Sequence, residues 1–169
     1  MLRAVAATPA GSWPEAEARD SVTLAYDERF RRRIKLATDR GAELLLDLPK
    51  ALALGDGDGL RLEDGSWVLV RAAAEPLAEL TGEPSLLLRL AWHLGNRHTP
   101  AQLLPGALRI RPDHVLVEMA RGLGAAVREI AAPFQPESGA YAQSQAQGHG
   151  HAHGHAHGHS HTHGHDHDH

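Results

Sequence analysis

The chain has 169 residues, no cysteine and a formal charge of −4 with its histidines neutral. The lack of cysteine excludes disulfides, thiolate metal sites, iron–sulfur clusters and a cysteine nucleophile, so any metal must bind through nitrogen and oxygen. The charge is spread evenly and no stretch approaches the roughly 18 consecutive apolar residues of a membrane span, so we expect neither nucleic acid nor a membrane as a partner. With no apolar segment typical of a signal peptide, we expect a cytoplasmic protein.

Up to about residue 73 the pattern is that of short β-strands. The strand-like runs are 22–27 (VTLAYD), 32–38 (RRIKLAT), 43–48 (ELLLDL), 59–65 (GLRLEDG) and 66–72 (SWVLVRA). Turn residues separate them, and Asp64-Gly65 between alternating runs predicts a hairpin. The GDGDG stretch at 55–59 predicts a tight turn, because the further ligands of a calcium or phosphate loop do not follow it. We therefore predict a small all-β domain over residues 1–73.

One basic run, RFRRRIK at residues 29–35, lies in the second of these strands. Its charged residues alternate with Phe30, Ile34 and the following Leu36, as on the solvent face of a strand. The alternative is a docking patch for an acidic partner. No aromatic platform accompanies the run, which argues against RNA binding.

From residue 74 onward the apolar period becomes helical in two places. A first helix is predicted from Pro84, with Gly95 as its left-handed C-cap, and a second follows the expected N-cap Asp113 and ends at Gly122 or Gly124. Their expected buried stripes are Leu87, Leu90, Ala91 and Leu94, and Leu116, Met119, Ala120 and Leu123. Strands are predicted at 77–80, 101–104, 107–111 and 126–132. The resulting β-α-β-β-α-β order predicts a ferredoxin-like domain over residues 74–140, and an α+β chain.

The last 21 residues, HGHAHGHAHGHSHTHGHDHDH, place a histidine at every second position. No residue between these eleven imidazoles is apolar and larger than alanine, so the segment cannot bury enough surface to offset the entropy of ordering, and we predict a disordered tail over residues 141–169. Neutral imidazole is a common ligand of transition metals, and alternation brings many of these side chains to one side of an extended chain. An expression tag or a drifting low-complexity repeat is the alternative, but the interspersed Gly, Ala, Ser, Thr and Asp favour a native metal-binding segment.

Three further histidines precede the tail: His93, His98 and His114. His98 lies in GNRHTP, beyond the predicted helix end, and is expected on an exposed corner. One imidazole cannot complete a nickel or zinc site of roughly four to six donors, but a two-fold dimer could bring two copies of His98 together, with tail imidazoles as further donors. His114 is a secondary candidate ligand or an exposed first-turn residue, and His93 is expected to pack beside Leu90. No catalytic motif is present, so we expect no enzyme.

Three segments of the second half, AWHLGNRHTPAQ from Ala91, RPDHVLVEMARGLGA from Arg111 and PFQPESGAY from Pro133, precede the histidine-rich tail in that order. Together they resemble the urease accessory protein E family, the nickel metallochaperones. The first half resembles that family mainly in its short-strand organisation. The resemblance implies an N-terminal domain likened to a peptide-binding fold, and a ferredoxin-like domain that binds metal and forms a homodimer.

The resemblance also implies roles for particular residues and partners. The histidine of GNRH, His98, would bind Ni2+ at the dimer interface, His114 matches the DHVL position, and the tail would bind further ions. Nickel would pass to the urease apoprotein through a complex with the urease GTPase accessory protein. The expected metal ligands are His98, His114, His149, His151, His153, His155, His157, His159, His161, His163, His165, His167 and His169.

Two other interpretations stay open. In the first, the protein stores or detoxifies nickel or zinc and the folded part is only a carrier for the tail. In the second, it is an interaction module that uses the basic strand and a peptide-accepting β domain. The ligand types do not rank the metals, since Zn2+ or Cu2+ would also bind to imidazole and Cu2+ generally binds most tightly.

Overall fold

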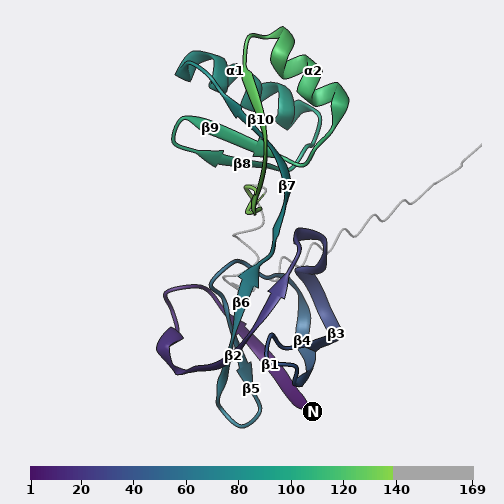
Figure 1. The fold of residues 1–169 in the computed structure, drawn as a ribbon. Coiled ribbons are helices and arrows are strands. Elements are labelled where there is room, and N and C mark those ends of the chain that lie inside the picture. The colour runs from purple at the N-terminus through teal and green to yellow at the C-terminus, as the bar shows by residue number, and fades with distance from the viewer. Residues whose placement is uncertain (139–169) are drawn as a thin grey trace, which may run out of the picture. The chain divides into compact units, whose positions relative to one another are not determined.

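The computed structural model describes residues 1–138, which form two sheets in succession along the chain (Figure 1). The tail predicted over residues 141–169 lies outside the described residues. Each sheet has its own apolar core, and all the buried members of one core come from residues 4–70 while those of the other come from residues 78–125. No helix among residues 1–138 has the length and apolar character to span a bilayer.

The first sheet has six strands and two short 3-10 helices, Glu15–Glu17 and Tyr26–Glu28. The strands are β1 (Leu2–Thr8), β2 (Ala18–Leu24), β3 (Phe30–Ala37), β4 (Glu43–Ala53), β5 (Gly59–Leu62) and β6 (Trp67–Ala72). Their order in the sheet is β2-β6-β5-β1-β4-β3, with β1–β4 and β2–β6 parallel and the other pairs antiparallel. The inward-facing side chains are almost all leucine, valine and alanine, which gives the domain its core.

Most of the predicted features of this half are confirmed. The Asp64-Gly65 turn joins the antiparallel strands β5 and β6, with Gly65 at φ 83°. GDGDG forms a tight turn closed by a hydrogen bond from the Asp58 N–H to the Gly55 carbonyl, and Gly57 within it has a positive φ, 85°. The strand β1 was missed, because its LRAVAAT sequence is rich in alanine, which has a low β propensity, and it is held by pairing with the distant strands β4 and β5.

The second sheet is ferredoxin-like, as predicted, so the α+β class is confirmed. Its elements in chain order are β7 (Ala74–Thr81), α1 (Pro84–Asn96), β8 (Ala101–Leu104), β9 (Ala107–Ile110), α2 (His114–Gly122) and β10 (Ala126–Pro133). The strand order is β10-β7-β9-β8, and all three pairs are antiparallel. Leu90 and Leu94 of α1 and Leu116 of α2 pack into one core with Ala78 and Leu80 of β7. The Asp113 carboxylate caps α2 by accepting hydrogen bonds from the backbone of its first turn, as predicted.

Glu79 on the central strand β7 carries the main ion-pair network of this sheet. Its carboxylate accepts hydrogen bonds from Arg109 of β9 at 2.9 Å and from Arg128 of β10 at 2.6 Å, both directly opposite in the pairing register. The two guanidinium groups, Arg128 first, hold the pKa of Glu79 below its ordinary value near 4.5 although burial opposes this. A carboxyl group with a lowered folded-state pKa stabilises the fold above its unfolded pKa and loses this contribution as the pH falls through the folded pKa.

We therefore expect the substitution Glu79→Gln to lower the free energy of unfolding at pH 7 by about 1 kcal/mol, a modest value because the side chain of Arg128 is 75% exposed and screened. The native chain should lose stability as the pH is lowered below about 4.5, whereas the variant should lose less over the same range. Urea unfolding at pH 7 and at pH 3.5 measures both quantities. Parallel losses in the two chains would show that Glu79 does not contribute to the acid sensitivity.

The segment after β10 is held at both of its ends. The buried side chain of Arg29 donates hydrogen bonds to the Phe134 carbonyl and, at 2.6 Å, to the Gln135 side chain. Farther along, the Glu137 N–H donates to the Ala101 carbonyl at 2.9 Å. Ala101 begins β8 and lies only three residues after His98, so Glu137 is bonded to the strand that directly follows the His98 turn.

Candidate metal centre

His98 lies at the C-terminal end of α1, where the chain turns towards β8. The helix does not end at Gly95, so that prediction was wrong, but continues to Asn96. Two backbone hydrogen bonds close the turn, from the His98 N–H to the Gly95 carbonyl at 3.0 Å and from the Thr99 N–H to the Leu94 carbonyl at 3.1 Å. This pair of bonds is a Schellman motif, which places the left-handed residue at His98. The prediction failed because glycine is tolerated in a last helical turn and did not mark the point where the chain reverses.

The second helix ends in the same motif with a different residue at the equivalent position. At the end of α2, the Gly124 N–H donates to Arg121 and the Ala125 N–H donates to Ala120. Gly124 has φ 102°, whereas His98 has φ 52° and is the one non-glycine residue with a positive φ in the described part of the chain. A side chain at such a position costs roughly 1 kcal/mol relative to glycine. Backbone strain of this kind is typical of functional sites. At this strained position the exposed imidazole of His98 is the group available for binding.

The helix α1, which precedes His98, has a second apolar face that is exposed to solvent. Leu88 and Trp92 lie one turn apart and are 74% and 66% exposed, while Leu90 and Leu94 on the opposite face are fully buried. Leu88 and Trp92, together with Arg89 and His93, line a cavity of about 400 Å³. We refer to Leu88, Trp92 and this cavity as the α1 patch. Large apolar side chains that are exposed together on one helix face are typical of a protein–protein interface.

The α1 patch was not predicted, although the sequence contains a signal for it. Three consecutive leucines, residues 86–88, cannot all face one core on a helix, so one of them must point elsewhere. Trp92 lies four residues after Leu88 and extends that second stripe. His93 is half-buried, and its ring meets that of Trp92 edge-on with the ring centroids 5.0 Å apart.

The other candidate ligands are more scattered. His114 is exposed at the first position of α2. Within residues 1–138, no group of three or more His, Asp or Glu side chains is arranged to hold a metal ion. The predicted tail ligands, from His149 to His169, lie outside the described residues. A single copy of the described fold thus offers His98 as an exposed donor, which needs donors from elsewhere to complete a site.

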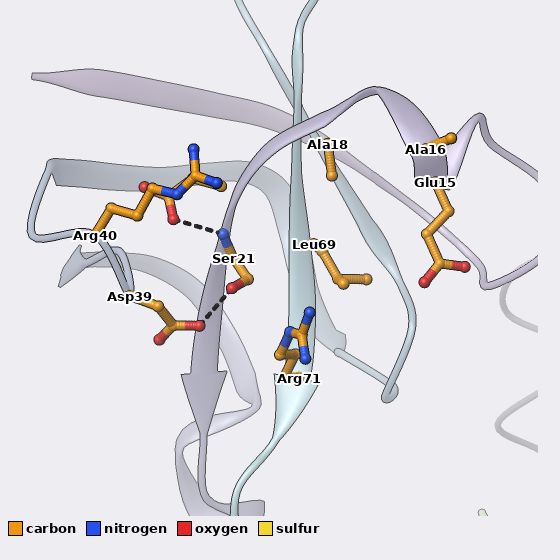
Figure 2. A pocket seen from close by; sticks show the side chains of 9 residues that line it. Glu15, Ala16, Ala18, Ser21, Asp39, Arg40, Leu69 and Arg71 are labelled. Carbon is orange, nitrogen blue, oxygen red and sulfur yellow. Dashed lines mark hydrogen bonds between the residues drawn. The ribbon is translucent and has the colours of Figure 1, made fainter.

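A polar hollow of about 600 Å³ lies beside β2 (Figure 2). Two of its three carboxylates are engaged by neighbouring groups, and one of these, Asp39, accepts hydrogen bonds from the hydroxyls of Ser21 and Thr23, at 2.5 and 2.9 Å. Burial alone would raise the pKa of Asp20, but hydrogen bonds from the Thr38 side chain and the Ser21 backbone outweigh it and keep this pKa below its ordinary value. Asp20 and Asp39 are therefore already paired within the fold, in contrast to the exposed imidazole of His98.

Comparison with known proteins covers both halves of the chain. Residues 1–73 match the family "UreE urease accessory protein, N-terminal domain", and residues 75–169 match "UreE urease accessory protein, C-terminal domain". The "Urease accessory protein UreE" of Bradyrhizobium sp. (strain ORS 278) is 56% identical over 144 residues, which are 85% of this chain and 68% of that protein.

Two further relatives carry the same name. That of Rhodopseudomonas palustris (strain BisB18) is 54% identical over 143 residues, 84% of this chain and 67% of that protein. That of Rhodobacter capsulatus is 50% identical over 141 residues, 83% of this chain and 87% of that protein. The resemblance inferred from the GNRH, DHVL and PESGAY segments is thereby confirmed. The chain belongs to the family of UreE urease accessory proteins, which are accessory proteins and not enzymes.

Proposed function

We propose that this protein is a nickel metallochaperone of urease assembly, which captures Ni2+ and delivers it to the urease apoprotein. Membership of the urease accessory family supports the role in assembly. The observation that carries the metal-binding part is the placement of an exposed histidine in the left-handed position at the end of α1, where the equivalent position of α2 has glycine. A site built from imidazole without thiolate exchanges its metal readily, as a delivery protein requires.

The metal would be held between two copies of the chain. The α1 patch supplies the reason, because an exposed leucine and tryptophan next to an apolar cavity favour burial against another apolar surface. In a two-fold dimer the same patch meets itself, and the two copies of His98 at the ends of the paired helices would approach the axis. Ni2+, and also Zn2+ or Cu2+, would be bound by these imidazoles, with His114 as an auxiliary donor.

The histidines from His149 to His169 would act as a collector of ions. Their attachment supports this role, since Glu137 is bonded to Ala101, close in sequence to His98. The eleven residues between Glu137 and His149, acting as a short tether, would give an effective concentration in the millimolar range around the anchor point. Delivery would follow in a complex with the urease GTPase accessory protein and the urease apoprotein. We place this process in the cytoplasm, which suits a chain without cysteine.

The proposed division of labour assigns a role to each part of the chain: residues 1–73 as a β domain for protein contacts, residues 74–140 for dimerisation and delivery, and residues 141–169 for capture. The test is a nickel titration by calorimetry with light scattering on the same samples. Three chains are compared: the intact chain, a chain ending at Gln147, and that shortened chain carrying His98→Ala.

We expect the shortened chain to keep about one tight nickel site per dimer and the His98→Ala variant to lose it, because two imidazoles at the axis are the core of that site. The intact chain should bind roughly three to five more ions per tail, from donor counting at two to four imidazoles per ion. This additional load should fall as the pH drops through about 6.5, since protons compete for imidazole nitrogen. If the shortened chain binds no nickel tightly, the assignment of His98 is wrong.

The second candidate is storage or detoxification of nickel or zinc, favoured by the eleven imidazoles of the tail. Deletion of residues 148–169 separates the two functions. Storage predicts that nearly all function is lost with the tail, whereas delivery predicts partial activation of urease through His98. Urease activity in cells that carry the shortened chain, at several nickel concentrations, measures the difference.

A further inference from the structure

The two edge strands of the first sheet, β2 and β3, differ in how far their backbones are covered. At the β2 edge, the turn between β3 and β4 folds over the strand: the Asp39 N–H donates to the Ser21 carbonyl at 2.7 Å, and the Asp39 carboxylate accepts the Thr23 N–H at 3.1 Å. The Arg40 guanidinium adds a hydrogen bond to the Arg19 carbonyl at 2.9 Å. Figure 2 shows Asp39 and Arg40 beside Ser21 on this edge. The backbone of β2 is therefore covered, and the edge is closed to a further strand.

The opposite edge is β3, and no comparable turn within residues 1–138 covers it. β3 pairs with β4 on one side, and no strand within residues 1–138 pairs with it on the other. Ile34 and Leu36 pack against the core, so the strand is fixed in place. An ordered edge strand with a free row of backbone N–H and C=O groups is the template that strand addition requires.

The β3 edge is also strongly cationic. Four of its eight residues are basic, in the run Arg31-Arg32-Arg33 and at Lys35, and the last three of these are exposed. The carboxylate of Asp47 lies 3.6 Å from Arg33 but is already bound by Arg3 at 2.6 Å. The hydrogen bond from Arg3, and then the charges of Arg33 and Arg32, hold the pKa of Asp47 below its ordinary value, although burial opposes this. One carboxylate thus faces several guanidinium groups, and the edge keeps a positive excess.

We propose that the outer edge of β3 binds an extended acidic segment of a partner protein, which adds to the sheet as a further strand. Backbone hydrogen bonds would supply affinity, and carboxylates of the segment would pair with Arg32, Arg33 and Lys35, where arginine can bind a carboxylate through two parallel hydrogen bonds. A nucleic acid fits the site less well, because sequence-tolerant binding of single strands uses several stacked aromatic rings and β3 offers only Phe30. The proposal is independent of nickel and of His98.

The probe is a fluorescein-labelled peptide of twelve residues that alternates glutamate and threonine, which is acidic and prone to extended structure. Its control is the peptide with glutamine in place of glutamate. Binding to the full chain is measured by fluorescence anisotropy at pH 8 with a chelator present. At that pH imidazoles of ordinary pKa are neutral, and the chelator removes metal, so neither protonated tail histidines nor bound ions attract the peptide.

The test variant is the double substitution Arg32→Glu with Lys35→Glu, and the matched control is Arg61→Glu with Arg71→Glu. All four residues are exposed on strands of the same sheet, and both variants change the net charge by the same amount. We expect the test variant to weaken binding at least about tenfold and the control to change it by less than about twofold. The glutamine peptide should bind at least about tenfold more weakly than the acidic one to the native chain.

Hydrogen exchange of the backbone amides separates strand addition from simple charge attraction. The acidic peptide should slow the exchange of amides within residues 31–37 of the native chain and leave those of β2 unchanged. Equal losses of affinity in the two variants, or unchanged exchange at β3, would overturn the proposal and leave the basic run as a device that keeps an edge strand from aggregating. Binding of a labelled twelve-nucleotide single strand under conditions where the peptide does not bind would overturn it in favour of a nucleic acid.

Discussion

Replacement of His98 by glycine is expected to stabilise the fold and, in the same variant, to remove the nickel site at the dimer interface. Glycine adopts the left-handed conformation without the steric cost that a Cβ imposes, and His98 has φ 52° in a Schellman motif. We expect the free energy of unfolding to rise by about 1 kcal/mol, which corresponds to an increase in Tm of roughly 3 °C for a chain of this size. The nickel affinity of the shortened chain should fall at least about a hundredfold, since loss even of a residue that supports a ligand costs up to that much.

Two control variants separate the loss of the imidazole from the effect on the backbone. His98→Ala removes the imidazole but keeps a Cβ, so it should lose nickel without the gain in stability. Gly124→Ala places a Cβ at the equivalent position of α2, where its nearest neighbour outside the turn is Leu86 Cδ2 at 4.0 Å, so the cost should come from the backbone alone. This variant should lose about 1 kcal/mol and keep its nickel site. Thermal unfolding and calorimetry on metal-free samples measure both effects.

The combination of results decides the meaning of His98. A more stable variant without nickel would show that the chain keeps histidine at a cost to stability because the imidazole is used. If His98→Gly were less stable than the native chain, the side chain would instead contribute contacts to the fold. If it bound nickel as tightly as the native chain, the candidate centre would have to be sought elsewhere.

Features formed by residues close together in the sequence were predicted correctly, whereas features that depend on distant residues were not. The hairpin at Asp64-Gly65 and the N-cap at Asp113 were predictable because the residues that make them lie within a few positions of one another. β1 was not predictable from its own alanine-rich sequence, because its partners Leu44 and Leu62 lie far along the chain. Long-range pairing outweighs local propensity in such a strand.

The candidate metal site could likewise be predicted only in part from the sequence. The sequence context of His98 marks it as a candidate ligand but does not show its left-handed backbone, which was predicted for Gly95 instead. Glycine is the usual residue there, so a rule based on frequency selects it even where the chain reverses three residues later. The α1 patch was missed for a related reason, since Leu88 and Trp92 are typical core residues and only the burial of the opposite face shows that they point outwards.

Substitution of Trp92 by glutamate is expected to separate the proposed dimer into folded monomers. Trp92 is 66% exposed in the single chain, so the substitution should change the free energy of unfolding of a monomer by about 0.5 kcal/mol or less. In a two-fold dimer the substitution occurs twice, and a buried tryptophan at an interface is typically worth 2 kcal/mol or more. A total of about 4 kcal/mol corresponds to a rise of about a thousandfold in the dimer dissociation constant. Sedimentation equilibrium over a range of protein concentrations measures this constant.

The matched control is Phe30→Glu, which places the same charge at an aromatic residue of similar exposure, 61%, on the first sheet. It should remain dimeric, and both variants should have the same far-UV circular dichroism as the native chain. A dimer that survives Trp92→Glu would assign the interface to another surface, and the geometry proposed for the two copies of His98 would be wrong.

Nickel binding by the Trp92→Glu variant then connects the interface to the metal. If each tight site needs two copies of His98, the shortened chain carrying this substitution should bind nickel weakly when dilute and regain affinity as its concentration approaches the new dissociation constant, because mass action restores the dimer. Nickel should in turn strengthen dimerisation by the same free energy, since the two equilibria are linked. A monomeric variant that keeps the tight site at all concentrations would show that His98 binds with donors of its own chain, so the α1 patch would be an interface without a role in holding the metal.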